Sequence, residues 1–313
     1  MKVFVAGGTG AIGSHAVPAL IAAGHAVSAL ARSPEKAAEL SEQGAEPVRV
    51  SIFDRVGLTE AMAGHDAVVN LASAIPPMTR FMLTSAWRDN DRVRTEGSAA
   101  IVDAAIDAGV ERVVQESVCM LYPDQGAHWI DESVATDDYP MARANLAAEA
   151  NAKRFAEAGG AGVVLRFGWF YGPGASHSEQ FLALAARHIC VQMGRGDGYV
   201  SSIHMVDGGA AVAAALSAPA GTFNVVDDEP LTKRGYAEAL ARAAGKRTWL
   251  RAPGRAALLL GDRSTSLTRS LRVSNRRFRA ERGWAPRYTS ARDGWIATAA
   301  ALGTHRSSGV ARR

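Results

Sequence analysis

The feature that most constrains this chain is a glycine-rich turn between an apolar segment and an amphipathic stretch. Residues 2–6 (KVFVA) are typical of a buried strand, and glycines follow at positions 7, 10 and 13. A dinucleotide pyrophosphate needs a turn without Cβ atoms, backbone N–H groups at a helix N-terminus, and a glycine that lets helix and strand approach closely. This segment offers all three, and the alternative is a purely structural turn. The residues expected to bind a dinucleotide are Gly7, Gly10, Ala11, Ile12 and Gly13.

Short apolar runs alternate with helical patterns through the first two-thirds of the chain. The runs lack polar alternation, which is typical of parallel strands covered on both faces. We therefore expect an α/β fold, a doubly wound parallel sheet of the Rossmann type with a smaller C-terminal substrate lobe. The expected strands are 2–6, 26–30, 47–50, 67–71, 112–116 and 162–167.

The domain organisation follows from where this alternation weakens. We expect a NAD(P)-binding Rossmann domain over residues 1–172 and a smaller, mostly helical substrate lobe over 173–302, with part of the sheet edge interleaved. Residues 303–313 are small, polar and basic, which is typical of a disordered tail.

Charge and cysteine content narrow the function classes. The formal net charge is +4 and the isoelectric point about 9.3, but no DNA-binding module accompanies the basic residues, so we expect no nucleic-acid partner. Cys119 and Cys190 lack the spacing of a zinc site or a disulfide framework, so we expect no metal and a reducing compartment. No signal peptide or long apolar run is apparent, so we expect no membrane partner and a cytoplasmic location. A small-molecule substrate is the expected partner.

Several later motifs give the chain a family resemblance. The glycine spacing GxxGxxG is followed by Asp54 in SIFD, by NLAS at 70–73, by RVVQES at 112–117 and by RFGWFYGPG at 166–174. Together these motifs, over roughly residues 1–295, resemble the extended short-chain dehydrogenase/reductase family, the NAD-dependent epimerase/dehydratase group.

The resemblance implies further cofactor contacts. Asp54 would meet the adenine, although a helix N-cap is the alternative for this residue. Leu71, Ala72 and Ser73 would pass beneath the cofactor near its ribose. Phe167 at the end of the sixth strand, with Trp169 and Phe170 after it, would approach the nicotinamide and begin the substrate pocket.

The resemblance also implies a homodimer, which would form through the helices near 85–109 and 140–158.

The end of the second expected strand indicates which nicotinamide cofactor binds. An acidic side chain there would pair with the ribose 2′-hydroxyl, but residues 29–34 (ALARSP) contain no carboxylate. Arg32 offers a planar donor fork and Ser33 a hydroxyl where a 2′-phosphate would lie. NADP(H) is therefore favoured, NAD(H) remains an option, and a solvated charge is the alternative interpretation of Arg32.

The catalytic positions depart from the family pattern of Ser, Tyr and Lys. Ser117 aligns with the first serine of the family's SSxxxY run, and Val118 takes the place of the second, which is normally catalytic. The helix register set by residues 146–149 (LAAE) places Met141 at the tyrosine and Asn145 at the lysine.

A second register keeps the spacing with Tyr139 and Arg143. If Asn145 faces the nicotinamide, Arg143 lies about 200° around the helix and points largely away. The residues that remain candidates for catalysis are Tyr139, Ser117 and Tyr122, with a scaffold role as the alternative for Tyr122.

Two functions follow. The first is an oxidoreductase or epimerase/dehydratase-like enzyme that acts on a small organic or sugar-like substrate with a nonstandard acid/base group. The second is a non-catalytic NADP(H)-binding sensor or scaffold.

Overall fold

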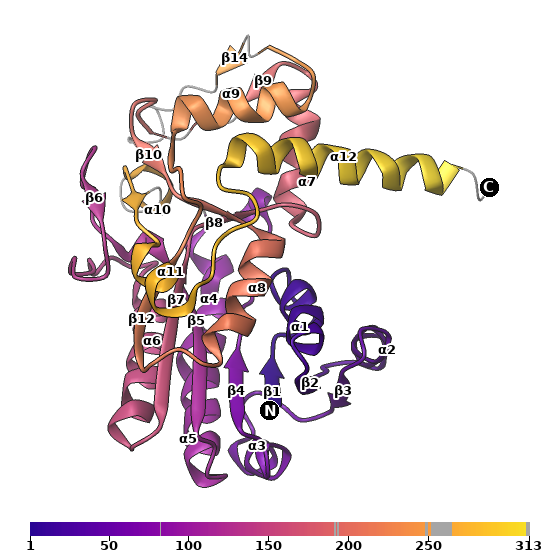
Figure 1. The fold of residues 1–313 in the computed structure, drawn as a ribbon, viewed down its shortest axis with the longest axis vertical. Helices are drawn as coiled ribbons and strands as arrows, with labels where there is room; N and C mark the ends of the chain where they lie inside the picture. Colours follow the sequence, from indigo (N-terminus) through magenta and orange to yellow (C-terminus); the bar gives the residue numbers. More distant parts are fainter. Residues whose placement is uncertain (82, 191, 193, 248–249, 252–264, 311–313) are drawn as a thin grey trace.

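The computed structural model describes residues 1–81, 83–190, 192, 194–247, 250–251 and 265–310. Seven strands form one parallel sheet in the order β12-β7-β5-β4-β1-β2-β3 (Figure 1). The strand order reverses between β1 and β4, where open sheets of this kind bind ligands. The expected doubly wound α/β fold is confirmed. The bounds are β1 Lys2–Ala6, β2 Ala26–Leu30, β3 Glu46–Val48, β4 Ala67–Asn70, β5 Arg112–Val118, β7 Ala161–Phe167 and β12 Gly221–Val225.

Helices cover both faces of the sheet because its side chains alternate between two apolar clusters. In β1, Val3 and Val5 belong to one cluster and Phe4 and Ala6 to the other. The first cluster includes residues of α1 Gly13–Ala22, α2 Pro34–Glu42, α8 Met205–Ala215 and α11 Arg276–Arg282. The second includes residues of α3 Arg55–Met62, α5 Ser98–Asp107 and α6 Arg143–Glu157.

The second half of the chain contributes to the Rossmann unit as well as to the lobe. Strand β12 joins the sheet beside β7, and α8 packs on α1, so residues on both sides of position 172 build the central layer. The close crossing of α1 and α8 requires Gly209, because a Cβ there would lie 2.6 Å from the carbonyl oxygen of His15. Short strands also connect the two parts. The pairs are β8 Trp169–Tyr171 with β11 Ser202–His204, and β6 Trp129–Ile130 with β15 Arg272–Val273.

The lobe has its own apolar cluster around Tyr171 and Trp295. Figure 1 shows the lobe helices gathered beyond one end of the sheet. No described helix is long and apolar enough to span a bilayer. The remaining lobe elements are α7 Ser176–Ala185, α9 Lys233–Ala243, α10 Thr265–Thr268, α12 Ala291–Val310, β9 Ile189–Cys190 paired with β14 Leu250–Arg251, and β10 Tyr199–Val200 paired with β13 Leu231–Thr232.

The last helix extends into the segment expected as a tail. Helix α12 runs on to Val310, past residue 303 where the sequence predicts the start of a disordered tail; disorder of this tail stays a prediction. Residues 299–302 (AAAL) are strong helix formers and carry the helix past Gly303. Figure 1 shows this helix leaving the lobe. Residues 311–313 lie outside the described residues.

The helix expected near 85–109 is built in pieces. A π-helical turn at Val93–Gly97 turns Arg94 inward, where its Nη1 donates a 3.1 Å hydrogen bond to the carbonyl of Glu116 in β5. The turn thereby ties the helix to the sheet. The pieces before α5 are 3-10 turns at Met78–Arg80 and Thr84–Trp87, α4 Arg88–Arg92 and the π turn itself.

Candidate active site

The turn after β1 is a cradle that has no room for side chains. Gly7 adopts a φ of +83°, and a Cβ on it would lie 2.6 Å from the carbonyl carbon of Leu71. A Cβ on Gly13 would lie 2.1 Å from the carbonyl oxygen of Gly7. The N–H of Gly10 closes the turn on the same oxygen at 2.9 Å. Glycine at both positions therefore brings the start of α1 close to the end of β1, and unpaired N–H groups at such a helix start suit a pyrophosphate.

The loop after β4 lies beside this turn, because a Cβ on Gly7 would meet the backbone of Leu71 and Ala72. Asn70 Oδ1 accepts a hydrogen bond from the N–H of Ala72 at 3.1 Å, and Asn90 Oδ1 accepts from the N–H of Ala74 at 3.2 Å. Leu71 is buried, Ala72 is half-buried and Ser73 is exposed; their contact with the ribose stays a prediction. Sequence reasoning did not identify the anchoring role of Asn90, because the contact spans two separate elements.

Arg32 and its neighbours lie at the end of β2. Ser33 caps α2, because its hydroxyl accepts from the N–H of Lys36 at 3.3 Å. Arg32 is exposed, and its guanidinium has no ion pair within the described part of the chain. Asp54 caps α3 by accepting from the N–H of Gly57 at 3.1 Å, as the alternative interpretation expected. Its contact with adenine stays a prediction.

Ser117 and Tyr122 belong to a buried polar network. Ser117 donates to Glu149 Oε1 at 2.6 Å, and Arg166 donates to both oxygens of Glu149 at 2.8 and 2.6 Å. Arg166 also donates to the hydroxyl of Tyr122 at 2.9 Å, and that hydroxyl donates to Asn224 Oδ1. Burial raises the pKa of Tyr122 to about 12. Both predicted catalytic side chains are fully buried and engaged in the interior, so we do not propose them as proton donors.

Tyr139 lies before the start of α6, near the pocket but with its hydroxyl engaged. That hydroxyl donates to the carbonyl of Met120 at 3.0 Å, and the guanidinium of Arg269 stacks 4.5 Å from the ring centre. Burial raises the pKa of Tyr139 to about 12, which makes it a weak acid near neutral pH. Arg143, the basic residue of that register, is exposed and pairs with Asp138.

The three positions that the resemblance aligns with the family's catalytic groups hold side chains that do not exchange protons near neutral pH. Val118 and Met141 pack in an apolar cluster with Leu121. Asn145 is 8% exposed, its Nδ2 lies 3.5 Å from the carbonyl of Met141, and its Oδ1 has no hydrogen-bond partner among the described residues. An orphaned acceptor at this position could receive a hydroxyl from the ligand.

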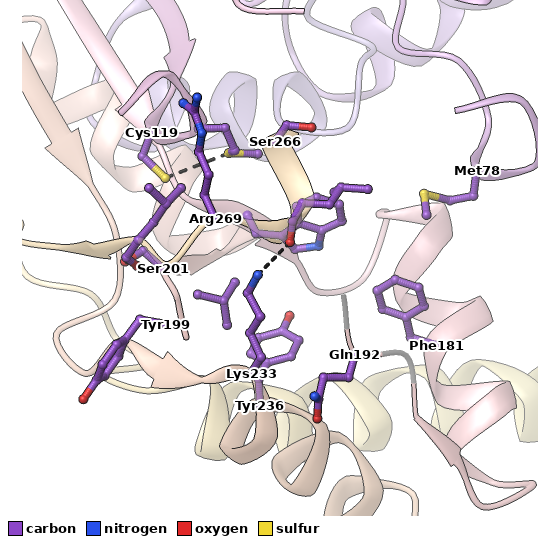
Figure 2. A pocket seen from close by; sticks show the side chains of 15 residues that line it. Met78, Cys119, Phe181, Gln192, Tyr199, Ser201, Lys233, Tyr236, Ser266 and Arg269 are labelled. Carbon is purple, nitrogen blue, oxygen red and sulfur yellow. Dashed lines mark hydrogen bonds between the residues drawn. The ribbon is translucent and has the colours of Figure 1, made fainter. Parts of the chain in front are cut away.

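A pocket lies between the end of β5 and the lobe (Figure 2). Of the three residues predicted after the sixth strand, Trp169 lines the pocket. Phe170 packs against Phe167, with ring centres 5.0 Å apart, and Phe167 is in the core. The lining residues are Met78, Cys119, Met120, Trp169, Phe181, Gln192, Tyr199, Val200, Ser201, Lys233, Tyr236, Ser266, Leu267, Arg269 and Leu271.

The pocket is mostly apolar and carries only positive formal charge. Among the described residues, its lining contains no Asp, Glu or His, and the two cations are Lys233 and Arg269. Arg269 is engaged, because it pairs with Asp137 and donates to the carbonyl of Tyr122 at 2.8 Å. Burial raises the pKa of the Cys119 thiol to about 12, so this cysteine is a poor nucleophile. Sequence reasoning missed Lys233, since a lysine at the start of a helix is ordinarily solvated.

The fold and the glycine cradle define a Rossmann protein built to hold a nicotinamide dinucleotide. The profile described as NAD(P)H-binding matches residues 7–180. The chain belongs to the extended short-chain dehydrogenase/reductase family, in its epimerase-like group. This confirms the resemblance inferred from the sequence motifs.

Two relatives and one solved structure illustrate the membership. A 3-diazoavenalumate denitrifying reductase from Streptomyces is 35% identical over 315 residues, covering 94% of this chain and 99% of the relative. An epimerase family protein of Mycobacterium bovis is 29% identical over 258 residues, covering 80% and 81%. A human epimerase family protein crystallised with NADPH superposes with a TM-score of 0.81 at 22% identity, covering 96% and 99%.

Proposed function

We propose that this protein is an NADP(H)-dependent reductase whose substrate accepts hydride without needing a proton from a protein side chain. The observation that carries the proposal is the set of residues at the catalytic positions, which are Val118, Met141 and Asn145. None of these groups donates or accepts a proton near neutral pH. The tyrosines nearby are buried, hydrogen-bonded and raised in pKa.

The residues at the cofactor site fit a nicotinamide dinucleotide. A Cβ at Gly7 or Gly13 would collide with the backbone of Leu71 or of Gly7, so only glycine allows the tight turn into α1 that a pyrophosphate needs. The buried Oδ1 of Asn145 lacks a partner among the described residues and is suited to accept a ribose hydroxyl. Arg32, exposed at the end of β2, is placed to donate to a 2′-phosphate, which supports NADP(H) over NAD(H).

The relative that acts as a denitrifying reductase suggests the class of acceptor. A reduced nicotinamide supplies hydride, and when an aryl diazonium carbon accepts it, a C–H bond forms, the C–N bond breaks and dinitrogen leaves with the bonding pair. That exchange balances without any proton. Reduction of an aldehyde or ketone, by contrast, produces an alkoxide that must be protonated. Without a protein acid, reduction of a diazonium group should therefore still proceed, whereas reduction of an aldehyde or ketone should be slow.

The chain's own residues would hold such a substrate and exclude water. Trp169 and Phe181 offer aromatic faces, and Met78 and Met120 offer adaptable apolar side chains. Exclusion of water protects a diazonium group from hydrolysis as well as favouring transfer.

The test is turnover with a labelled cofactor. NADPH carrying deuterium at the transferable position is incubated with the protein and a diazonium derivative of an aromatic acid, and the product is examined by mass spectrometry. We expect deuterium at the carbon that lost dinitrogen, at a rate well above that of a protein-free control. Gly13→Ala, which closes the cradle, should remove the excess rate.

Comparison substrates separate the two functions. Aldehydes and ketones should be reduced far more slowly than the diazonium acids. Tight NADPH binding with no turnover on any of these compounds would replace the reductase proposal with the sensor or scaffold function.

A further inference from the structure

Lys233 is a buried cation at the centre of the pocket. It is the first residue of α9, it is 7% exposed, and Figure 2 shows its side chain reaching into the pocket between Tyr199 and Phe181. Among the described residues its ammonium donates one hydrogen bond, to the carbonyl of Leu267 at 2.8 Å. An ammonium has three donors, so two have no acceptor within the described part of the chain and suit a ligand.

The charge of Lys233 is not balanced by an ion pair among the described residues. The other cation of the pocket, Arg269, already pairs with Asp137. Within the described part of the chain, the acid that stabilises the ammonium through space is Asp124, which is not within ion-pair distance. Burial lowers the pKa of Lys233 to about 8, so the group is still mostly charged at neutral pH. A buried charge without a partner is costly, and the arrangement is relieved when a ligand brings the counter-charge.

Two other polar atoms of the pocket lining also lack partners. Gln192 Oε1 and Ser266 Oγ are buried, line the pocket, and have no hydrogen-bond partner within the described ranges. The hydroxyl of Ser266 can donate to a carboxylate, whereas Gln192 Oε1 is an acceptor and suits a donor group elsewhere on the ligand. The remaining lining is largely aromatic and aliphatic.

We infer that the pocket takes an aromatic monocarboxylate whose carboxylate pairs with Lys233 while its ring packs against the aromatic wall that includes Trp169. This inference deepens the proposed function by naming the class of substrate, and it rests on that function for which end of the ligand reacts. The reacting end lies toward Cys119 and Met120 at the carboxyl end of β5. A nucleotide diphosphate fits less well, because one uncommitted ammonium in an apolar pocket cannot satisfy two phosphates.

Binding of simple probes tests the inference without turnover. Calorimetry in the presence of NADPH compares trans-cinnamate with cinnamamide, which has the same shape without the charge. The wild-type protein should bind cinnamate more tightly. Lys233→Met should weaken cinnamate binding about 10- to 100-fold and leave cinnamamide nearly unchanged. Arg234→Met is the matched control, because it removes the same charge from the next, exposed residue.

Several results would overturn the inference. They are equal affinity of the wild-type protein for the two probes, no binding of cinnamate, an unchanged affinity in Lys233→Met, or tighter binding of UDP-glucose than of cinnamate. These binding results can be interpreted even if the reductase test shows no turnover, so either proposal can be rejected without the other. In turnover assays Lys233→Met should raise KM with little change in kcat. A fall in kcat at constant KM would make Lys233 a proton donor and would overturn its assignment to substrate binding.

The thermal midpoint of Lys233→Met shows whether a loss of cinnamate binding comes from misfolding. Replacing an unpaired buried ammonium by an apolar side chain of similar length should leave the thermal midpoint unchanged or raised. If Lys233→Met does not fold, Lys233→Gln keeps a polar group in the pocket and is assayed in its place. It should show the same loss for cinnamate, because the charge is what the carboxylate recognises.

Discussion

The hydroxyl of Ser117 donates a 2.6 Å hydrogen bond to Glu149 Oε1, and so the serine of β5 faces the interior. Successive residues of a strand point to opposite faces, which turns the next side chain, Val118, toward the cluster beside Met141. The serine lies one residue too early in the strand, so the side chain that faces the cluster beside Met141 is the isopropyl group of Val118 and not a hydroxyl. For this reason we do not expect Ser117 to act as the family's catalytic serine.

Ser117→Ala should act on stability and not on turnover. The substitution removes one donor from Glu149, which keeps its two bonds from Arg166. We expect a loss of about 1–2 kcal/mol in the free energy of unfolding, measured with urea, and an unchanged NADPH affinity. A turnover loss of a hundredfold with normal stability would restore Ser117 as a catalytic residue.

Gly13→Ala should prevent cofactor binding. The new Cβ would lie 2.1 Å from the carbonyl oxygen of Gly7, so the loop must move and its N–H groups lose the pyrophosphate. Two lost charge-assisted bonds correspond to a fall in NADPH affinity of about a hundredfold or more, measurable by calorimetry. Gly303→Ala is the control, because a Cβ there meets nothing within 4 Å. Normal NADPH affinity in folded Gly13→Ala would show that the dinucleotide does not bind this loop.

Arg32→Ala should separate the two nicotinamide cofactors. The guanidinium is exposed and unpaired within the described part of the chain, so its removal should cost the folded protein little. NADPH affinity should fall about 10- to 100-fold, and NADH affinity should stay nearly constant. Equal losses for both cofactors would give Arg32 a structural role instead.

The sheet and the cofactor cradle could be predicted because their signals are local. The strand Lys2–Ala6, the glycines after it and the amphipathic α1 are consecutive in sequence. At Gly7 and Gly13 a Cβ would collide with neighbouring backbone atoms, which explains why glycine is needed there. The motif at 166–174 likewise predicted that Trp169 would border the pocket. Local patterns of this kind specify both the element and its neighbour.

The far wall of the pocket could not be predicted, because it depends on contacts between distant segments. Lys233 is followed by Arg234, and nothing in the sequence distinguishes the two. In the folded protein Lys233 is buried and Arg234 is exposed. The carbonyl that accepts a hydrogen bond from Lys233 belongs to Leu267, more than thirty positions away.

Tyr139→Phe should have little effect on turnover. The hydroxyl is engaged by the carbonyl of Met120, and its pKa of about 12 opposes proton release near neutral pH. We expect kcat within a few-fold of wild type and a loss of about 1 kcal/mol of stability from the missing hydrogen bond. Steady-state assays with the diazonium acid measure the first and urea unfolding the second. A hundredfold loss of kcat would establish the register that pairs Tyr139 with Arg143.

The pH dependence of substrate capture should report the ionisation of Lys233. Burial lowers its pKa from 10.5 to about 8, so the free enzyme loses the ammonium as the pH rises through that value. Three groups lie near it: the charge of Asp124 favours the ammonium, Arg269 pairs with Asp137, and burial raises the pKa of Tyr236.

A carboxylate substrate is already ionised above about pH 5, so the pH-sensitive partner is the lysine. The ratio kcat/KM should therefore be level near neutral pH and fall about tenfold per pH unit above about 8. In the complex the bound carboxylate raises the pKa of Lys233, so kcat should stay level to higher pH than kcat/KM. Lys233→Met should abolish the alkaline fall in kcat/KM and leave a uniformly low value, while Arg234→Met should reproduce the wild-type profile. An alkaline limb that persists in Lys233→Met would assign the ionisation to another group and contradict the pairing of Lys233 with the substrate carboxylate.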